Sequence, residues 1–547
     1  MQSERQTFIE REVRRAVGPL HQHLDALWEQ GEKGVALEQA VGLISRLTAR
    51  LAALEYEVQL GHHKRKSEQL DPKQLALALD QLQEAGLLES DEQEEVEDPE
   101  VEDLIKEAEE ERKQRGEATP DRRRRRELPA NLRRDPVELD VPEDDQRCPC
   151  CGGERVEIGR DVTEKLDLEP IRFRVLRFER VRRACACKES GVVVGPPPKA
   201  QFERLMASVA LVAFVVASKY DAFLPLYRMQ KLCRQMGCPI SDDTLGGWVT
   251  RAGDELEPLA EALLQEVKES WLVQTDATGI RVLDIDAPGG SRLGQMWCYL
   301  GDGGRLCVFK YAPDGEGQNG PWKYLAGRTG YVQADASSTF DRLFNGRAAD
   351  AIEVGCIAHA RRGLAELLDS DPRVAWPLKR IQQLYRVEKA AKAQNMGPGA
   401  RLALRRQKSK PVLDTLRAWL VKAVGREPPK SALAGACAYW LNHWVALTRF
   451  LDDGRLEIDN TDVEREMRSI ALTRKNSLFV GSDRGGREAA ILHSLVRTCV
   501  LNDVEPIAWM TDVLGKLLDG WPKSRIRELL PHRWVKQAEQ EPQAQVG

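Results

Sequence analysis

Five short apolar segments lie close together between residues 271 and 360, and Gly-rich turns separate the first three. Their length and their content of Val, Ile, Tyr, Phe and Trp are typical of β-strands. We expect strands over residues 271–283, 296–304, 305–313, 330–336 and 351–360. The close spacing of the first three favours an antiparallel meander. Because helical patterns dominate before and after this region, the sequence predicts a mixed α+β fold.

Two of the expected strands carry an aspartate in the same setting. Asp276 follows Trp-Leu-Val-Gln-Thr and Asp335 follows Tyr-Val-Gln-Ala, and each precedes Ala and then a small hydroxyl residue. A single aspartate in this position is most often the cap of a turn or helix. Two in matching positions favour a metal pair, because their carboxylates converge if the strands are neighbours and Mg²⁺ prefers oxygen ligands.

A helix expected from about residue 460 supplies candidates for a third acidic ligand. Asn460, Glu464 and Arg468 are spaced i, i+4 and i+8, which places an amide, a carboxylate and a guanidinium on one face. Such a face suits metal ligation beside phosphate binding. Two metal ions about 3.5–4 Å apart can activate a water or a 3′-hydroxyl and stabilise a leaving oxygen. Asp462 and Glu466 form a different stripe, which we expect to be solvated.

Charge is distributed unevenly along the 547 residues. The net charge is −5, whereas residues 373–430 hold 15 Lys and Arg against 3 Asp and Glu, a local charge of +12. This asymmetry indicates either a surface that faces a polyanion or a solvated helical surface. Residues 89–111 are strongly acidic, and five consecutive arginines follow at 122–126. We expect these two runs to form a flexible linker, in which the arginines contact DNA phosphates or pair with the acidic run.

Apolar residues between Leu37 and Val58 recur at alternating spacings of three and four. This heptad seam is typical of a coiled coil and predicts self-association through residues 34–60. The alternative is one helix packed on its own domain.

Residues 223–256 have the spacing of a helix-turn-helix, with Ser241 as a plausible N-cap of the second helix. Asp242 and Asp243 at the start of that helix would repel phosphate. Helical packing is therefore favoured over DNA reading by this helix.

Five of the twelve cysteines lie between residues 148 and 187. The chain starts without the apolar run of a secretory signal, so this cluster suggests metal rather than disulfides. The longest apolar stretch, 205–217, is too short to span a bilayer and is expected to be a buried helix. The sequence contains neither a Walker-type phosphate loop nor the nucleophile elbow of a serine hydrolase, which argues against ATP dependence and against that hydrolase class.

The sequence resembles transposases of the insertion-sequence-66 family, which are DDE enzymes with a ribonuclease-H-like core. The resemblance runs in family order over roughly residues 145–535 and rests on KYDAFLPLYRMQK, QTDATG, YVQADASSTFDRL, GCIAHARRGLAELL, LEIDNTDVEREMRSIALTRKNSLFVGSDRGGREAA and LLPHRW. The sequence departs from the family at Ala277, where Glu is usual, and at Asp459, where Asn is usual.

The resemblance implies a site and its ligands. Asp276, Asp335 and Glu464 would hold two Mg²⁺ or Mn²⁺ ions, nick transposon ends and join the freed 3′-hydroxyl to target DNA. The residues expected to contact DNA are His359, Arg361, Arg362, Arg468, Arg474 and Lys475. Structural Zn²⁺ would be held by Cys148, Cys151, Cys185 and Cys187, with Cys150 as an alternative thiol. The alternative interpretation is a small domain with free thiols.

The implied partners are transposon-end and target DNA, further copies of the chain in a homodimer or higher oligomer, and small accessory proteins encoded by the element, with no membrane. The expected location is cytoplasmic and nucleoid-associated in a bacterium. The alternatives are a catalytically inactive transposase-derived DNA-binding protein and a ribonuclease-H-like nuclease. Tyr439, Trp440 and Trp444 would stack on a flipped base or, as the favoured interpretation, form the core of a helical bundle.

The expected fold class is a multidomain α+β protein whose ribonuclease-H-like α/β core carries a helical insertion. We expect an N-terminal coiled coil (1–61), a charged linker (62–143), a zinc-finger-like module (144–198), a helical DNA-binding region (199–267), the first part of the core (268–365), a basic helical insertion (366–455), the second part of the core with the catalytic helix (456–500), and C-terminal helices with a tail (501–547).

Overall fold

A five-stranded mixed sheet forms the centre of the computed structural model, which describes residue 28 and residues 75–76, 78–79, 98–114, 173–184, 192–428, 430–477 and 479–534. The strand order is β5-β4-β3-β6-β7, with bounds β3 (Leu272–Leu283), β4 (Ser291–Gly301), β5 (Leu306–Ala312), β6 (Tyr331–Gln333) and β7 (Ile352–Val354). The first three strands pair antiparallel, which confirms the predicted meander. β6 and β7 extend the sheet in parallel with β3.

The two faces of the sheet pack against different helices. Along β4, Trp297 and Tyr299 belong to one buried cluster, whereas Met296 and Cys298 belong to another. This period of two is the pattern of a strand that is buried on both faces. The first cluster faces α5 (Val209–Tyr220) and α7 (Asp242–Glu269), and the second faces α15 (Thr461–Asn476).

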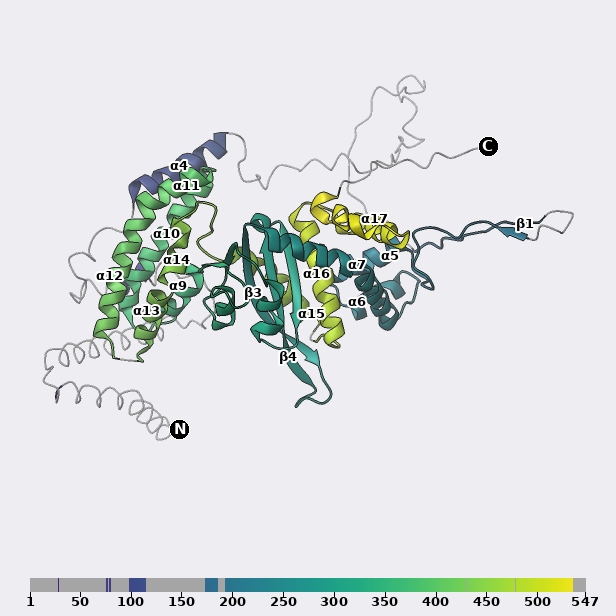
Figure 1. The fold of residues 1–547 in the computed structure, drawn as a ribbon, viewed down its shortest axis with the longest axis horizontal. Helices are drawn as coiled ribbons and strands as arrows, with labels where there is room; N and C mark the ends of the chain where they lie inside the picture. The colour runs from purple at the N-terminus through teal and green to yellow at the C-terminus, as the bar shows by residue number, and fades with distance from the viewer. Residues whose placement is uncertain are drawn as a thin grey trace, which may run out of the picture.

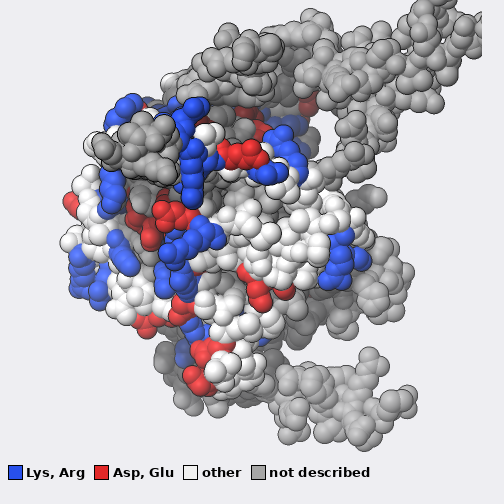
Figure 2. Space-filling view, turned by 90° about the vertical axis from the view of Figure 1, so that its right-hand side faces the viewer, with Lys and Arg blue, Asp and Glu red and all other residues white. Residues whose placement is uncertain are grey.

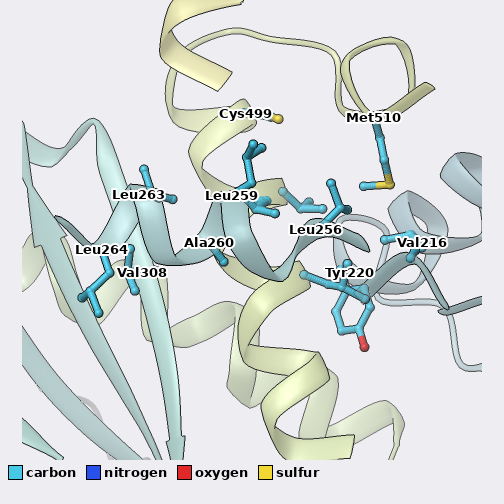
Figure 3. Close-up of a cluster of buried hydrophobic side chains, with 14 of the residues drawn as sticks. Val216, Tyr220, Leu256, Leu259, Ala260, Leu263, Leu264, Val308, Cys499 and Met510 are labelled. Atoms are coloured by element: carbon cyan, nitrogen blue, oxygen red, sulfur yellow. The ribbon is translucent and has the colours of Figure 1, made fainter. Parts of the chain in front are cut away.

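Helices from both ends of the described chain build the larger cluster. α5 and α7 meet α16 (Asp483–Leu501) and α17 (Pro506–Leu518). Figure 3 shows side chains of these helices, with Leu264 of α7 beside Val308 of β5. α5 is the apolar stretch predicted to be a buried helix, and most of its residues are buried. No helix in the described ranges is both long and apolar enough to traverse a bilayer.

The predicted cap of α7 is confirmed. The Ser241 hydroxyl accepts a hydrogen bond from the Thr244 backbone N–H at 3.2 Å. Asp242 and Asp243 occupy the first turn, where negative charge is stabilised by the helix dipole. α7 packs on α6 (Leu226–Gln235) and α5, and its residues Leu245, Trp248 and Val249 are buried. Helical packing, the interpretation favoured for this segment, is thus observed.

The outer strand β5 is covered along its open edge by α16. The Ser494 hydroxyl accepts from the Phe309 N–H at 2.7 Å, and the Thr498 hydroxyl accepts from the Cys307 N–H at 3.2 Å. These side chains replace a neighbouring strand, so that this edge is closed to pairing with another chain.

A helical bundle follows β7 and has a core of its own, seen on the left of Figure 1. Its elements are α9 (Ile357–Ala365), α10 (Ala375–Ala393), α11 (Pro398–Leu404), the π-helical turn η6 (Arg405–Ser409), α12 (Lys410–Arg426), α13 (Ala432–Asn442) and α14 (Trp444–Thr448). Trp440 is fully buried and donates its indole N–H to the Ala360 carbonyl at 2.9 Å. Trp440 is thus a core residue, as favoured, and Tyr439 and Trp444 pack partly buried beside it.

The basic segment 373–430 lies in this bundle, and part of its charge is internal. Arg380, Arg401 and Arg405 are buried. The idea that the whole excess of positive charge faces outward is wrong for these three arginines, because internal carboxylates and carbonyls satisfy Arg401 and Arg405.

The segment expected to be a flexible charged linker contains a regular helix, α4 (Pro99–Gln114), which packs on α10. Residues 173–181 form no strand pairing, and Val175 is 92% exposed. The antiparallel pair there is β1 (Arg182–Ala184) with β2 (Val192–Val194). The predicted coiled coil at 34–60, the arginine run at 122–126 and all five clustered cysteines lie outside the described residues.

Candidate active site

The register of β3 against β6 brings the two aspartates together. The parallel pairing ends at Gln274 and Gln333, and Asp276 and Asp335 each lie two residues further along. β3 continues past Asp276 to Leu283 because β4 still pairs with it, so Asp276 lies inside a strand rather than at its end. Asp276 lies where the parallel half of the sheet stops.

The face from which Asp276 projects is the one covered by α15. Ile280 and Val282, at even positions along β3, contact Val463, Met467 and other residues of the α15 cluster. Since side chains alternate across a strand, Asp276 belongs to the same face.

Two glutamines dock the chain that leads into α15 onto the sheet. The Gln274 amide donates to the side-chain carbonyl of Gln333 at 3.0 Å and to the Asp459 carbonyl at 3.3 Å. The Gln333 amide donates to the carbonyls of Gly355 and Glu457 at 3.1 and 2.9 Å. The start of α15 is therefore held directly over β3 and β6.

Asn460 completes this attachment. Its side-chain amide donates to the Thr275 carbonyl at 2.9 Å, and its backbone N–H meets the Cys356 sulfur at 3.3 Å. Asn460 is fully buried, and its Oδ1 atom has no hydrogen-bond partner among the described residues. One turn later, Glu464 is half-buried, with Oε1 at 3.7 Å from Nδ1 of His359 on α9.

The electrostatic environment of Asp276 differs from that of an ordinary surface carboxylate. Burial raises the pKa of Asp276, and the nearby charge of Asp335 raises it further. The Ala277 N–H, which donates to Oδ1 at 2.7 Å, and the charges of His359 and Arg362 lower the pKa of Asp276 but do not cancel the rise. The fold therefore holds two acidic groups near each other at a cost in free energy.

The carboxylates are near one another without forming a closed ligand set. Over the described ranges, no three His, Cys, Asp or Glu side chains are grouped closely enough to hold a metal ion. The donors nevertheless fit a hard divalent cation. Asp276 and Asp335 repel each other, and a cation between them would remove this repulsion. The buried Oδ1 atom of Asn460 has no hydrogen-bond partner among the described residues, and the amide of the same side chain donates to the carbonyl of Thr275, the residue before Asp276.

Glu466 corrects one expectation from the sequence. It was expected to be solvated together with Asp462, but it is buried and accepts hydrogen bonds from Arg497 of α16 at 2.8 and 3.3 Å. Asp462 is half-buried and pairs with Arg465 at 3.2 Å. The Glu466–Arg497 pair ties α15 to α16, because a helix packed on two sides buries a second stripe.

The basic residues predicted to contact DNA lie at different distances from the acidic groups. Arg361 and Arg362 are on α9 beside His359, and the charge of Arg362 reaches Asp276. Arg468 is exposed one turn beyond Glu464. Arg474 and Lys475 are exposed at the end of α15, and Arg474 donates to the Gly279 carbonyl at 2.7 Å.

Figure 2 shows the end of the molecule on which α5, α6 and α17 lie. On this side, Lys and Arg are interspersed with Asp and Glu rather than gathered into one basic surface. The helical region at 199–267 thus presents mixed charge on the face that is visible there.

Three residues near the site were missed by the sequence analysis. Gln274 and Gln333 form the Gln-x-Asp pattern that both strands share, which is the signal that would have found them. Tyr439, considered only for stacking or core packing, has its hydroxyl 3.4 Å from the Ala336 N–H, next to Asp335. Burial raises the pKa of Tyr439, so this phenol stays protonated at neutral pH.

A buried ion cluster in the helical bundle holds the segment before α15. Its members are Glu388, Arg401, Arg405 and Glu457. Arg405 donates to the carbonyls of Phe450 and Leu456 at 2.8 Å each. Arg401 donates to both carboxylate oxygens of Glu457 at 2.9 Å. Hydrogen bonds from the bundle therefore hold residues 450–457 in place, and hydrogen bonds to and from the sheet hold residues 457–460.

Comparison with known proteins identifies the class. Residues 145–188 match the zinc-finger binding domain of transposase IS66, residues 204–488 match the Transposase IS66 family, and residues 494–532 match the IS66 C-terminal element. These matches are all to transposase sequences. The chain belongs to the IS66 family of transposases.

Similar proteins come from Sinorhizobium fredii (strain NBRC 101917 / NGR234). The uncharacterized protein y4qI is 34% identical over 72% of this chain and 74% of its own length. The uncharacterized protein y4jD is 33% identical over 74% of this chain and 81% of its own length, and y4hP is 31% identical over 75% and 77%.

Proposed function

We propose that this chain is an active transposase that cleaves DNA at transposon ends and joins those ends to target DNA, with Asp276, Asp335 and Glu464 as its catalytic residues. One observation carries the proposal. The parallel register of β3 and β6 puts both aspartates at equivalent positions, and the helix that carries Glu464 covers the face from which Asp276 projects.

We further propose that the core is ribonuclease-H-like. This proposal is supported by the strand order β5-β4-β3-β6-β7, in which an antiparallel meander is extended by two parallel strands from its first member. It is also supported by the position of the helical bundle, which is inserted between β7 and α15. Such an insertion separates Asp335 from Glu464 in sequence while leaving them on one face of the sheet.

In this proposal, the three carboxylates hold two Mg²⁺ or Mn²⁺ ions, which supply Lewis-acid activation of the attacking oxygen and stabilise the leaving oxygen. Asp276 must be ionised to do so, and burial, which raises the pKa of Asp276, opposes that ionisation. His359, which lies against Glu464, orients that carboxylate. Gln274, Gln333 and Asn460 position the helix that carries it.

The remaining roles follow from family membership and exposure. Arg361, Arg362, Arg468, Arg474 and Lys475 contact the DNA backbone near the site. Cys148, Cys151, Cys185 and Cys187 bind Zn²⁺ in the segment that matches the zinc-finger binding domain, with Cys150 as the alternative. The heptad segment 34–60 pairs subunits so that two transposon ends are held together.

The test uses purified full-length protein, Mg²⁺ or Mn²⁺, and a plasmid carrying the DNA that flanks the gene. The wild type is expected to nick this DNA at the element ends and to produce joined products. Asp335→Asn should bind the same DNA and produce neither. Asp350→Asn, an exposed aspartate before β7, is the matched control and should behave as the wild type.

Equal activity of wild type and Asp335→Asn would refute the assignment of the carboxylates. A catalytically inactive, transposase-derived DNA-binding protein is the second candidate, favoured by Ala277, which stands where the family usually has Glu. Binding without cleavage by the wild type would select it. Cleavage without joining would instead select a nuclease on the same fold.

A further inference from the structure

Helix α4 is an acidic amphipathic helix that lies along the helical bundle. It carries seven Asp or Glu and three Lys or Arg. Figure 1 shows it lying on the bundle beside α10 and α11, far from the helices α5 and α6. Its apolar residues Val101 and Ile105 are buried against Val387 and Ala390 of α10. The contact is therefore a packed interface and not a chance approach of charged side chains.

Ion pairs flank this apolar seam on the bundle side. Glu102 lies 3.4 Å from Arg386, and Glu109 lies 3.7 Å from Lys389, both on α10. Lys408 of η6 pairs with Asp98 at 3.0 Å and also with Glu100. In addition, the Gln394 amide donates to the Leu104 carbonyl at 2.8 Å.

The cations that α4 engages differ from the internal ones. Arg401 and Arg405 are buried and are neutralised within the bundle by Glu388 and Glu457. With α4 in place, the side chain of Lys389 is 64% exposed, that of Arg386 33% and that of Lys408 15%. All three belong to the segment with a charge of +12, and residues 98–109 supply a carboxylate to each of them. The acidic helix α4 therefore covers three cationic side chains of α10 and η6.

This cover is weak enough to be displaced. Exposed ion pairs contribute only about 0–1 kcal/mol each and are screened by salt. The apolar part of the seam amounts to a few side chains. Duplex DNA presents one negative charge per ~1.7 Å and gains affinity from counterion release, so it competes well for such a surface.

We propose that the surface formed by α10 and η6 binds the phosphate backbone of duplex DNA, and that α4 occupies this surface in cis until DNA displaces it. The proposal rests on the chain being a DNA-binding transposase. α4 then acts as a brake, because the apparent affinity for DNA is reduced by the fraction of molecules in which the surface is open.

The experiment compares two triple variants of the full-length chain that change the charge of α4 equally. Glu100→Gln, Glu102→Gln and Glu109→Gln remove the carboxylates that pair with the bundle. Asp103→Asn, Glu107→Gln and Glu110→Gln remove three exposed carboxylates of the same helix. Binding of a fluorescent duplex of arbitrary sequence is measured without divalent metal, as a function of salt.

The first variant is expected to bind the duplex about five- to tenfold more tightly than the wild type at low salt, and the control less than twofold more tightly. Ile105→Ser, which weakens the seam without changing charge, should also tighten binding. Amide hydrogen exchange of α4 in the wild type should accelerate when the duplex is added.

Equal tightening in both triple variants would overturn the proposal, because bulk charge would then explain it. Unchanged affinity in the first variant and in Ile105→Ser would overturn it as well. In either case the wild type still binds DNA and the proposed transposase function stands. If neither the wild type nor any variant binds duplex, DNA binding itself fails along with the brake.

Discussion

Two buried carboxylate sites in this protein treat negative charge in opposite ways. In the helical bundle, burial alone would raise the pKa of Glu457, but hydrogen bonds and charge from Arg401 and Lys392 outweigh it and lower the pKa to about 2. At the sheet, burial raises the pKa of Asp276, and Asp335 adds to the rise. The charge of Glu457 is therefore stabilised by cationic partners, whereas the cations near Asp276 do not offset its burial and the charge of Asp335.

The difference separates a structural ion cluster from a functional site. Glu457 is held by arginine at 2.9 Å and has no capacity left for a ligand. Asp276 receives one short hydrogen bond, from its own neighbour Ala277, and faces a like charge. A carboxylate whose charge is destabilising in the empty site can be stabilised by a bound cation. Groups with pKa values shifted in this way are typical of catalytic and metal-binding sites.

The largest effect is expected for Asp276→Asn. Activity in DNA cleavage should fall by about 10³-fold or more, because a ligand to the proposed metal ions is lost. Stability should not fall. A folded-state pKa above the unfolded value means that stability is full below about pH 3.8 and is lost as the pH rises, so the amide should melt at or above the wild-type temperature at pH 7 without divalent metal.

A clear drop in the melting temperature of Asp276→Asn at pH 7 would contradict the inference that the ionised carboxylate of Asp276 destabilises the folded protein. The gap between variant and wild type should close as the pH falls toward 3.8. Thermal unfolding followed by circular dichroism at several pH values, beside a cleavage assay, measures both parts.

The reverse outcome is expected in the ion cluster. Arg405→Met should destabilise the protein by about 3–5 kcal/mol, because it leaves a buried carboxylate short of a partner and frees the carbonyls of Phe450 and Leu456. Arg406→Met, on the exposed neighbour, should change the stability by less than about 0.5 kcal/mol. Similar denaturant midpoints for these two variants would show that the cluster does not stabilise the bundle.

The pH dependence of Glu457 sharpens the same contrast. Its folded pKa of about 2 lies below the unfolded value of 4.5, so its stabilisation is present above pH 4.5 and is lost as the pH falls toward 2. The loss is on the order of 3 kcal/mol. Glu457→Gln should be less stable at neutral pH and should lose less stability in acid, and identical acid unfolding profiles for the two proteins would refute this.

The smallest effect is expected where the two regions meet. Gln333→Ala removes the donor that ties both Gly355 and Glu457 to the sheet, and should lower cleavage by about 10–100-fold through a misplaced α15. DNA affinity should stay unchanged, since Gln333 is buried. Gln318→Ala, at an exposed position after β5, is the control. A loss of DNA affinity that matches the loss of cleavage would argue against a purely positioning role.

Close approaches show how tightly this junction is built. Any side chain at Gly454 would meet the Pro398 carbonyl oxygen at 1.9 Å. Gly454 therefore lets the chain before α15 pass directly under the start of α11, within reach of Arg401, whose guanidinium lies 3.4 Å from the Gly454 carbonyl.

Much of the candidate site was predictable from short patterns. The matching contexts of Asp276 and Asp335 favoured a metal pair on the condition that their strands are neighbours, and the register of β3 and β6 shows that this condition is met. The i, i+4 spacing placed Asn460 and Glu464 on one face of a helix. Asn460 contacts the sheet at Thr275, and Glu464 lies 3.7 Å from His359 of α9, a residue whose charge lowers the pKa of Asp276. Such patterns succeed because strand and helix periods are local properties of the backbone.

The errors came where the answer depends on what lies on the far side of an element. Glu466 looked like a solvated residue because its stripe was distinct from that of Glu464, but α16 covers that stripe and supplies Arg497. The acidic run looked like a flexible linker because its composition is highly charged, but Val101 and Ile105 give it an apolar seam that fits α10. Neither partner is near in sequence.

The sequence by itself determined the class of elements, the meander, the cap of α7 and the matching positions of Asp276 and Asp335 on their strands, because each depends on residue spacing of a few positions. Only the tertiary structure decided which charged side chains pair with one another inside the molecule and which remain available to a ligand. That outcome depends on burial and on partners such as Arg497, 31 positions from Glu466, and Lys408, 310 positions from Asp98. The free energy of a charge is set by its surroundings rather than by its place in the chain.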